Sequence, residues 1–512
     1  MGKNDNKRQG LENFLKSDFL DTLHNRGLET FELVDKYPLL PPFSYANILR
    51  DQKTAGYLYQ VDEVKLTPAE EQVKHRLYNL IEMHLDTPGE SKETEFNKLL
   101  EEVIKENQKV LQDISLPGLE KAKYFIKRDI TGFGKIDPLM HDPNIEDVSC
   151  AGIATPLFIW HREYDSVQTN IQYEGEELNS FVARIVFRAG KHISSAFPIS
   201  DLALEGNHRI SVLYQKEVTP KGTSFTIRKF KADPYTVIDL INFGTIDVDI
   251  AAYLWMLVEN KMSIISIGST GSGKTTALNA ITGLVHPDYK IFSVEDVSEI
   301  NLNHENWFSL ISRSGFGAKG EGEIGLYDLI KSGVRHRPDY IIVGEIRGSE
   351  AYVMFQAMAT GHGGLCTMHA DSYDSASKRL QQKPMDIPPA YLPLMNCALV
   401  IRRIKDSVTG QSVRRAVSLE EIKSATQSNS VFRWEPRTDF FESNIHQSIL
   451  LQRIAEQTGQ TFEEVLNEYE KRIIIIRYMQ ERDIRDFKDV AEIIGKYYRE
   501  PKILMEKIER SI

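Results

Sequence analysis

Short apolar runs alternate with amphipathic segments in the second half of the chain. The apolar runs, which predict strands, are SIISIG, YKIFSVED, PDYIIVGE and GLCTMHA. The segments with apolar residues every three to four positions, which predict helices, are DIAAYLWMLVEN, KTTALNAITGLV, LYDLIKSGVRH and SEAYVMFQAMATG. Successive strand and helix units of this kind predict a parallel sheet covered by helices on both faces. We therefore expect an α/β core over residues 233–440.

A different pattern precedes this core. Short β-like runs are separated by Gly, Pro and Asp, and these runs are TPLFIW, SVQTNIQY, HRISVLY and SFTIRKF. One amphipathic segment, LNSFVARIVFRAG, interrupts them and predicts a helix. The pattern predicts an α+β domain over residues 128–232, and Pro234 suits a linker to the core.

The N-terminal part of the chain predicts a tail followed by helices. Residues 1–40 are polar and lack a helical stripe, so we expect a loosely ordered tail or docking arm. Residues 41–127 are expected to be helical, with an N-cap at Thr67 before Pro68. The apolar face of the first of these helices is formed by Val73, Leu77, Leu80 and Ile81.

The C-terminal part, residues 441–512, also predicts helices. Thr461 and Glu464 form a capping box at the start of the longest of them. No apolar run reaches the roughly 18 to 20 residues that a membrane span needs. The polar start, MGKNDNKRQG, does not resemble a secretory signal.

The composition is that of a globular protein and argues against nucleic-acid binding, a disulfide framework and a CxxC zinc site. The chain is 41% hydrophobic and 26% charged, as in ordinary globular proteins, and at 512 residues it predicts more than one domain. Its net charge of -11 argues against nucleic acid as the main partner. Cys150, Cys366 and Cys397 are too few and too far apart for a disulfide framework or a CxxC zinc site, which fits a reducing cytoplasmic setting.

The stretch GSTGSGKTT predicts a phosphate-binding loop. It satisfies GxxxxGK[ST], follows the apolar run SIISI and opens a predicted helix, which is the context that the motif requires. Backbone N–H groups would surround the phosphates of ATP, Lys274 would reach the β- and γ-phosphates, and the Thr275 hydroxyl would bind Mg²⁺. The predicted ATP-binding residues are Gly268, Ser269, Thr270, Gly271, Ser272, Gly273, Lys274, Thr275 and Thr276.

The acidic partner of this loop departs from the common pattern. A phosphate-binding loop of this type normally pairs with an apolar strand that ends in Asp. The candidate strand continues after Val343 with Gly344 and then Glu345, so the expected Asp is absent.

This departure resembles the secretion ATPase superfamily that powers type II secretion, type IV pili and their archaeal relatives. GEIRGSEA is similar to its atypical Walker B motif. FSVEDVSEI, with Glu295, Asp296 and Glu299, is similar to its acidic box, and ATGHGGLCTMHA, with His362 and His369, to its histidine box.

The resemblance covers residues 115–440 and implies the fold. GFGKIDPLMHDPNIEDVSCAG, PISDLALEGNHRISV and SFTIRKF resemble the PAS-like domain that precedes the motor core in this family. The expected fold is therefore an α/β RecA-like P-loop core with a parallel sheet, preceded by a PAS-like α+β domain and an N-terminal helical region. Upstream, YPLLPPFSYANIL and YLYQVDEVKLTPAE resemble the archaeal branch, most of all the archaellum motor ATPases.

Hydrolysis needs a group that orients the attacking water opposite the P-loop. The resemblance implies that Glu295 is this catalytic carboxylate and that Glu345 holds Mg²⁺ directly or through a water, although the sequence leaves open which of the two is the base. His362 and His369 would sense the nucleotide and relay its state to a neighbouring subunit. Single histidines and ED pairs are also common in purely structural positions.

Positive charge from another subunit or domain often acts on the nucleotide in phosphoryl-transfer rings. Arg209 and Arg228 stand at the family's positions for such residues, and Arg347 and Arg313 are further candidates. Each of them, taken alone, also fits a surface or salt-bridge role.

The resemblance implies a cytoplasmic homohexameric ATPase, associated with the inner face of the membrane through partner proteins, that drives assembly and rotation of the archaellum. The expected partners are a polytopic membrane platform protein and other cytoplasmic motor components. Three alternatives remain open: an archaeal pilus, secretion or DNA-transfer ATPase, a nucleic-acid motor, and a nucleotide-gated scaffold without turnover.

Overall fold

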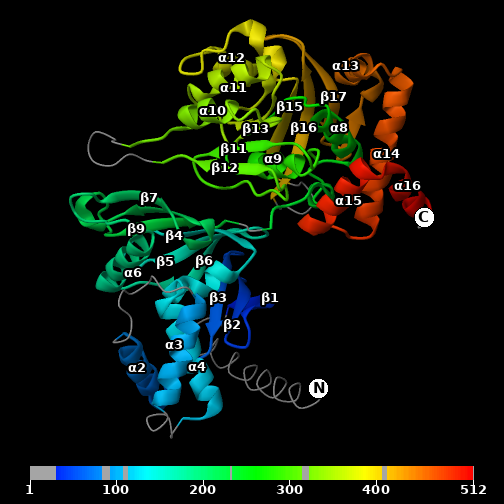
Figure 1. The fold of residues 1–512 in the computed structure, drawn as a ribbon. Coiled ribbons are helices and arrows are strands. Elements are labelled where there is room, and N and C mark those ends of the chain that lie inside the picture. The colour runs from blue at the N-terminus through cyan, green and yellow to red at the C-terminus, as the bar shows by residue number, and fades with distance from the viewer. Residues whose placement is uncertain are drawn as a thin grey trace. The chain divides into compact units, whose positions relative to one another are not determined.

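The chain divides into two compact units, residues 1–230 and 231–512, each with its own sheet (Figure 1). A computed structural model describes residues 30–82, 93–107, 114–230, 233–313, 322–405 and 412–510.

The described residues of the first unit form a nine-stranded sheet in the order β1-β2-β3-β6-β5-β4-β9-β8-β7. Its strands are β1 Phe31–Leu40, β2 Ser44–Asp51, β3 Tyr57–Glu63, β4 Ile145–Cys150, β5 Pro156–His161, β6 Asp165–Gln172, β7 Ile199–Ala203, β8 Arg209–Leu213 and β9 Ser224–Arg228. Neighbouring strands are antiparallel except β3 and β6, which pair in parallel with Leu58 opposite Gln168 and Tyr59 opposite Thr169.

The α-helices described in this unit pack into two separate cores. They are α2 Pro68–Glu82, α3 Glu93–Glu106, α4 Leu116–Ile130, α5 Asp137–His141 and α6 Gly175–Arg188. Helix α6 packs its apolar face, including Leu178 and Val182, into the core of the sheet. Helices α2, α3 and α4 form a separate small core that contains Leu77 and Ile81, so the predicted apolar face of α2 is confirmed.

The N-terminal prediction is wrong over residues 30–63. Strand β1 occupies the end of the predicted tail, and β2 and β3 begin the region predicted to be helical. These strands depend on contacts distant in sequence, because β3 pairs with β6 and the Tyr59 hydroxyl donates to Asp142 Oδ2 at 2.6 Å. Such tertiary pairing overrides local pattern. The rest of the predicted tail, residues 1–29, lies outside the described residues.

The described residues of the second unit form a sheet in the order β12-β11-β13-β14-β10-β15-β16-β17-β18. Its strands are β10 Ile264–Ile267, β11 Ile291–Glu295, β12 Trp307–Ile311, β13 Tyr340–Val343, β14 Gly363–Met368, β15 Cys397–Lys405, β16 Ser412–Ile422, β17 Ser428–Glu435 and β18 Phe440–Ser443. In this order the strands β12, β11, β13, β14, β10 and β15 are parallel, and they include the four strands that were predicted, β10, β11, β13 and β14. The sheet is nevertheless mixed, because β16, β17 and β18 continue it antiparallel.

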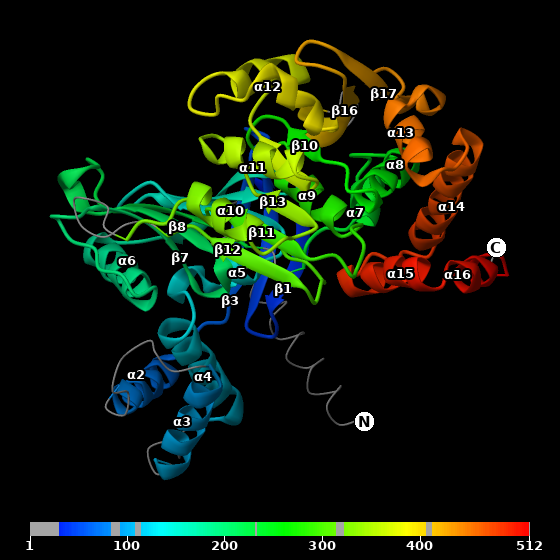
Figure 2. The same ribbon diagram turned by 45° about the horizontal axis from the view of Figure 1, so that its top comes forward.

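Helices cover both faces of this sheet (Figure 2). They are α7 Val237–Asn242, α8 Val248–Glu259, α9 Lys274–Thr282, α10 Leu326–Val334, α11 Glu350–Ala359, α12 Tyr373–Gln381, α13 Ile449–Thr458, α14 Phe462–Glu481, α15 Phe487–Arg499 and α16 Pro501–Glu509. Along β13, Tyr340 and Ile342 face the core shared with α7, α8 and α9, whereas Ile341 and Val343 face α10, α11 and α12. Burial on both faces explains the continuous apolar run.

The C-terminal helices α13 to α16 pack into the same core as α8. The Trp255 indole N–H donates to the Tyr498 hydroxyl at 2.8 Å, and buried Arg472 pairs with Glu259. The capping box predicted at the start of α14 is present. Within the described ranges, no helix is both long and apolar enough to cross a bilayer.

Candidate nucleotide-binding site

The P-loop connects the carboxyl end of β10 to the first turn of α9. Gly271 and Gly273 have φ values of 72° and 94°, a left-handed conformation that glycine adopts without strain. Gly273 is the N-cap of α9 and provides no side chain to cap it, so the first N–H groups of the helix remain available to a ligand. Half-buried Thr275 and Thr276 follow in the first turn. This cradle fits the phosphates of a nucleotide.

Lys274 lies inside the loop and is buried. Its Nζ donates a hydrogen bond to the Ser269 carbonyl oxygen at 2.8 Å and lies 3.2 Å from His369 Nδ1. The Ser272 hydroxyl is fully buried and has no hydrogen-bond partner in the described part of the chain. The loop therefore presents a cation and a polar group of the kind that phosphate oxygens satisfy.

Glu295 ends β11 and is 2% exposed. Its Oε1 accepts hydrogen bonds from the backbone N–H groups of Glu299 at 3.0 Å and Ile300 at 3.1 Å. Its Oε2 is buried and has no partner among the described atoms. Burial raises the pKa of this carboxyl from 4.5 to about 8. The result is an oriented carboxyl group with one oxygen available for a water or an ion.

Gly344 follows β13 at the position where the usual Asp is missing. A Cβ atom on Gly344 would lie 3.1 Å from Glu295 Cγ and 3.4 Å from its Oε1. The space that an Asp side chain would need at residue 344 is therefore taken by Glu295, which comes from the neighbouring strand β11. The next residue, Glu345, provides the second carboxylate.

His369 lies between two of the predicted groups. Its Nε2 is 3.5 Å from Glu345 Oε1, and its Nδ1 faces Lys274. Burial and the Lys274 charge lower the pKa of His369, so the imidazole is neutral near pH 7. Arg379 donates to the His369 carbonyl oxygen at 2.7 Å and holds this residue from α12.

His362 is not brought to the same place. It precedes β14 and His369 follows it, so the two are separated by the length of the strand, about 20 Å. His362 Nδ1 lies 3.0 Å from the Ala357 carbonyl oxygen and 3.1 Å from Thr360 Oγ1.

Two of the candidate arginines have partners within the second unit. Arg347 pairs with Asp296 of the acidic box, and the Ser312 hydroxyl donates to the other oxygen of that carboxylate at 2.9 Å. Arg313 Nε donates to the Gly322 carbonyl oxygen at 2.9 Å. The Arg347 contact joins the loop after β11 to the loop after β13.

Arg209 and Arg228 belong to the first unit. They lie directly opposite each other on β8 and β9, and both are exposed. On its other side, Arg228 lies opposite Asp147 of β4. Like charges on facing strand positions repel each other.

One further residue near the P-loop belongs to no recognised sequence motif. Arg414 of β16 donates from Nε to the Gly271 carbonyl oxygen at 3.2 Å. The only signal was the repeated pair of arginines in IRRI and VRRA, which matches no phosphate-binding pattern.

The described residues contain no group of three or more His, Cys, Asp or Glu side chains placed to hold a metal ion. Mg²⁺ in nucleotide sites takes one or two protein ligands, and phosphates and waters supply the others. Thr275 and Glu345 suit this limited role.

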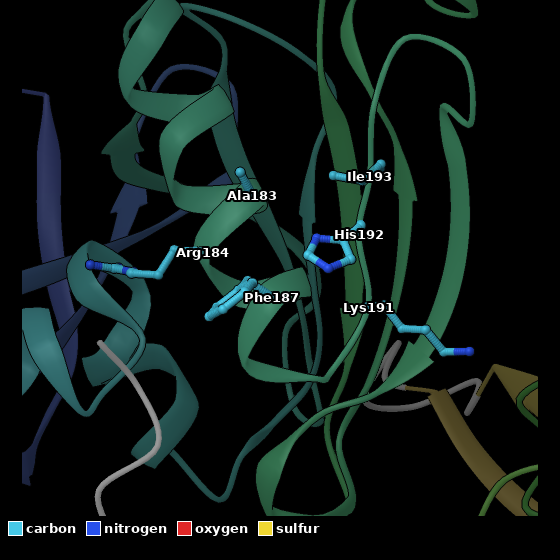
Figure 3. Close-up of a pocket in the computed structure, with 6 residues that line it drawn as sticks. All are labelled: Ala183, Arg184, Phe187, Lys191, His192 and Ile193. Atoms are coloured by element: carbon cyan, nitrogen blue, oxygen red, sulfur yellow. The ribbon is translucent and has the colours of Figure 1, made fainter. Parts of the chain in front are cut away.

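A surface cavity of about 420 Å³ lies in the first unit, and none of the predicted site residues lines it (Figure 3). Its lining residues are Ala183, Arg184, Phe187, Lys191, His192 and Ile193.

The chain is similar in sequence to one protein family and to several known proteins. Residues 176–410 match the family described as type II/IV secretion system protein. MJ0900 of Methanocaldococcus jannaschii, described as an uncharacterized protein, is 34% identical, with 97% of this chain and 96% of that protein covered. The type IV secretion system protein PtlH of Bordetella pertussis is 30% identical, with coverage of 53% and 89%. Among solved structures, the ATPase DotB of Legionella pneumophila is 14% identical and covers 69% of this chain and 91% of its own, with a TM-score of 0.41.

Proposed function

Because the chain belongs to the type II/IV secretion ATPase family, we propose that it hydrolyses ATP at the P-loop of its second unit and uses the energy to move the first unit. One observation carries this proposal: Lys274, Glu295 and the Glu345–His369 pair all lie at the carboxyl ends of adjacent parallel strands. Ligands of open α/β sheets bind at this edge.

The P-loop binds the substrate through residues 268–276. Lys274 exchanges its contact with the Ser269 carbonyl oxygen for the β- and γ-phosphates. Thr275 and Glu345 would hold Mg²⁺, which neutralises charge on the phosphates when bound.

Glu295 acts on the attacking water. Two backbone N–H groups fix its Oε1, and its Oε2 is the oxygen that accepts a hydrogen bond from the water. A carboxyl group with a pKa of about 8 is well matched to accept a proton near neutral pH. Glu345 is the alternative base, and a comparison of the two Gln variants separates these roles.

His369 links the two sides of the site. A γ-phosphate that attracts Lys274 weakens the contact between Lys274 and His369, and the imidazole then interacts more strongly with Glu345. His369 thereby senses the nucleotide, and we assign to His362 the relay of that state to a neighbouring subunit. Arg209 and Arg228 of the first unit act on the nucleotide of a homohexameric ring.

The mechanical task is assembly and rotation of the archaellum from the cytoplasmic face of the membrane. The chain would act through a polytopic membrane platform protein and other motor components. The resemblance of residues 37–70 to archaellum motor ATPases supports this assignment. The similarity to PtlH favours the second candidate, a pilus or secretion ATPase.

The decisive variant is Lys274→Ala. We expect it to lose Mg²⁺-dependent phosphate release, because the cation that contacts the β- and γ-phosphates is gone, while the wild-type chain hydrolyses ATP and forms hexamers when ATP is added. Phosphate release and light scattering after gel filtration measure these properties. A wild-type chain that stays monomeric with ATP and releases no phosphate would refute the proposal.

The same variant in the chromosome tests the cargo. Swimming, surface adhesion, protein export and DNA uptake are scored separately in the Lys274→Ala strain. Loss of swimming alone supports the archaellum, whereas normal swimming with loss of adhesion or export supports the second candidate.

A further inference from the structure

Arg414 contacts the P-loop from outside the motif. Its Nε donates to the Gly271 carbonyl oxygen at 3.2 Å, and its Cδ lies 3.1 Å from the position of a Cβ atom on Gly273. The aliphatic stem therefore packs against one glycine of the loop while the guanidinium holds the other.

The order of strands places Arg414 there. Strand β15 runs parallel to β10, and the last pair in register is Ile267 with Val400. Beyond this pair β15 continues past the end of β10 and passes the P-loop. Its antiparallel partner β16 then brings Arg414 opposite Arg403. The antiparallel extension of the sheet thus supports the phosphate cradle.

The neighbouring arginines on these strands have other tasks. Arg415 is buried and forms two hydrogen bonds with Asp439, at 2.7 and 2.8 Å. Arg402 donates to the Asp371 carbonyl oxygen at 3.1 Å. Neither contact involves a residue of the P-loop, GSTGSGKTT.

A bond to the Gly271 carbonyl has a consequence for phosphate binding. The C=O and N–H of a planar trans peptide point in opposite directions. When Arg414 holds the carbonyl of Gly271, it fixes the orientation of that peptide and stops the loop from turning a carbonyl oxygen toward an anion. The guanidinium also keeps its positive charge at every physiological pH.

We propose that Arg414 is a positioning residue for nucleotide binding, which fixes the Gly271–Gly273 segment and adds positive charge beside the phosphate cradle. The inference rests on the proposed function, because it assumes that the P-loop binds ATP. It assigns a role in the nucleotide site to the antiparallel part of the sheet.

Two variants of similar length test it. Arg414→Met keeps the stem on Gly273 but removes the charge and the donor, whereas Arg414→Lys keeps the charge. We expect Arg414→Met to raise the Kd for both MgATP and MgADP about tenfold and Arg414→Lys to raise it about threefold at most, as for loss of one charged hydrogen bond. The phosphates near Gly271 are shared by ATP and ADP, so both ligands should respond. Calorimetric titration of the full chain measures these constants.

The controls distinguish a loss of folding, a failure of the Arg414 inference and a failure of the proposed function. Arg402→Met, on the same pair of strands, should bind both nucleotides as the wild type does, and the Tm of Arg414→Met without nucleotide should match the wild-type value. Wild-type affinity in Arg414→Met, or a failure of Arg414→Lys to bind better than Arg414→Met, would overturn the inference. If Lys274→Ala also bound ATP normally, the proposed function itself would fail, not only the role of Arg414.

Discussion

Gly344 occupies the position where the usual motif has Asp, and the Glu295 side chain lies beside it. A Cβ atom at residue 344 would lie 3.1 Å from Glu295 Cγ, so the usual Asp after β13 would require the buried Glu295 side chain to shift. In the proposed function the acidic roles belong to Glu295 and Glu345. Gly344 and Glu295 are therefore a matched pair, and a change at either position affects the space of the other.

Glu295→Gln should lower the rate of phosphate release about 100-fold or more, because the amide cannot accept a proton from the attacking water. The Kd for ATP should change little, because the P-loop is intact.

In the wild type, kcat/KM should rise with pH and level off above about 8, since the deprotonated carboxylate is the active form. Phosphate release and nucleotide titration measure both effects. If Glu345→Gln loses hydrolysis and Glu295→Gln does not, Glu345 is the base.

The same residue should make the fold sensitive to pH. The pKa of Glu295 is raised in the folded state, so between pH 4.5 and about 8 the folded chain binds more protons than the unfolded chain, and the free energy of unfolding falls as pH rises. Glu295→Gln removes this effect. We expect its Tm to exceed the wild-type Tm by about 3 °C or more at pH 8 and by much less at pH 5. Equal Tm differences at both values would contradict the assignment of a raised pKa.

The sequence predicted the residues that belong to one short motif. It did not predict contacts between residues that are far apart in the chain. Gly271, Gly273 and Lys274 follow from the motif because the loop conformation and the phosphate contacts are set within nine residues. Neither the position of His369 between Lys274 and Glu345 nor the contact of Arg414 with Gly271 could be derived, because each joins strands that are far apart in sequence.

At the scale of elements, the parallel strands β10, β11, β13 and β14 were predictable because each is a largely apolar run buried on both faces. Strand β12 lies at one edge of the sheet and is partly exposed, and strands β15 to β18 carry charged residues, so their patterns are mixed. Strands β1 to β3 were missed because the parallel pairing of β3 with β6 joins them to the sheet. Such a pairing leaves no signal in the local pattern of apolar residues.

The loops after β11 and β13 are held together by Asp296 and Arg347. The Arg347 side chain is 59% exposed and that of Asp296 is 36% exposed, so this ion pair should contribute little to stability. It lies one residue from Glu295 and two from Glu345. We expect Arg347→Met to lower kcat several-fold, by about 1 kcal/mol of activation free energy, with the Tm nearly unchanged.

Steady-state kinetics and thermal unfolding test this prediction. Asp296→Asn should have the same effect, and the double variant should be no worse than either single variant, because the two residues act as one unit. Lys331→Met, an exposed change on α10, is the matched control. Wild-type kcat in Arg347→Met would show that the ion pair has no positioning role.

At the scale of the whole molecule, the predicted site residues occur in both units. The P-loop and the carboxylates belong to the second unit, and Arg209 and Arg228 to the first. If the arginines act on a nucleotide bound to a different subunit, a defect in one chain should be rescued by a partner chain.

We expect Arg228→Met to bind ATP normally and to hydrolyse it at least about tenfold more slowly, since it loses charge stabilisation of the transition state alone. Mixed rings of Arg228→Met and Lys274→Ala should regain part of the activity, because a Lys274→Ala subunit can supply its arginine to the intact P-loop of its neighbour. Phosphate release across mixing ratios measures the recovery, and Arg50→Met on β2 is the control. Mixtures with no activity above the sum of their parts would exclude action between subunits.

The pairing of β3 with β6 has a practical meaning for the limits of the first unit. Tyr37 and Tyr59 donate hydrogen bonds to the fully buried Asp142 carboxylate, and the Asn170 side chain bonds to both the N–H and the carbonyl of Val61. A truncated protein beginning at residue 128, the predicted start of the α+β domain, would lose these partners, remove both tyrosine donors from Asp142 Oδ2 and open one edge of β6 to other chains. The folding unit is therefore defined by which strands pair and not by the predicted start of the α+β domain at residue 128. Expression of the isolated domain calls for residues 30–63 as an inseparable part of it.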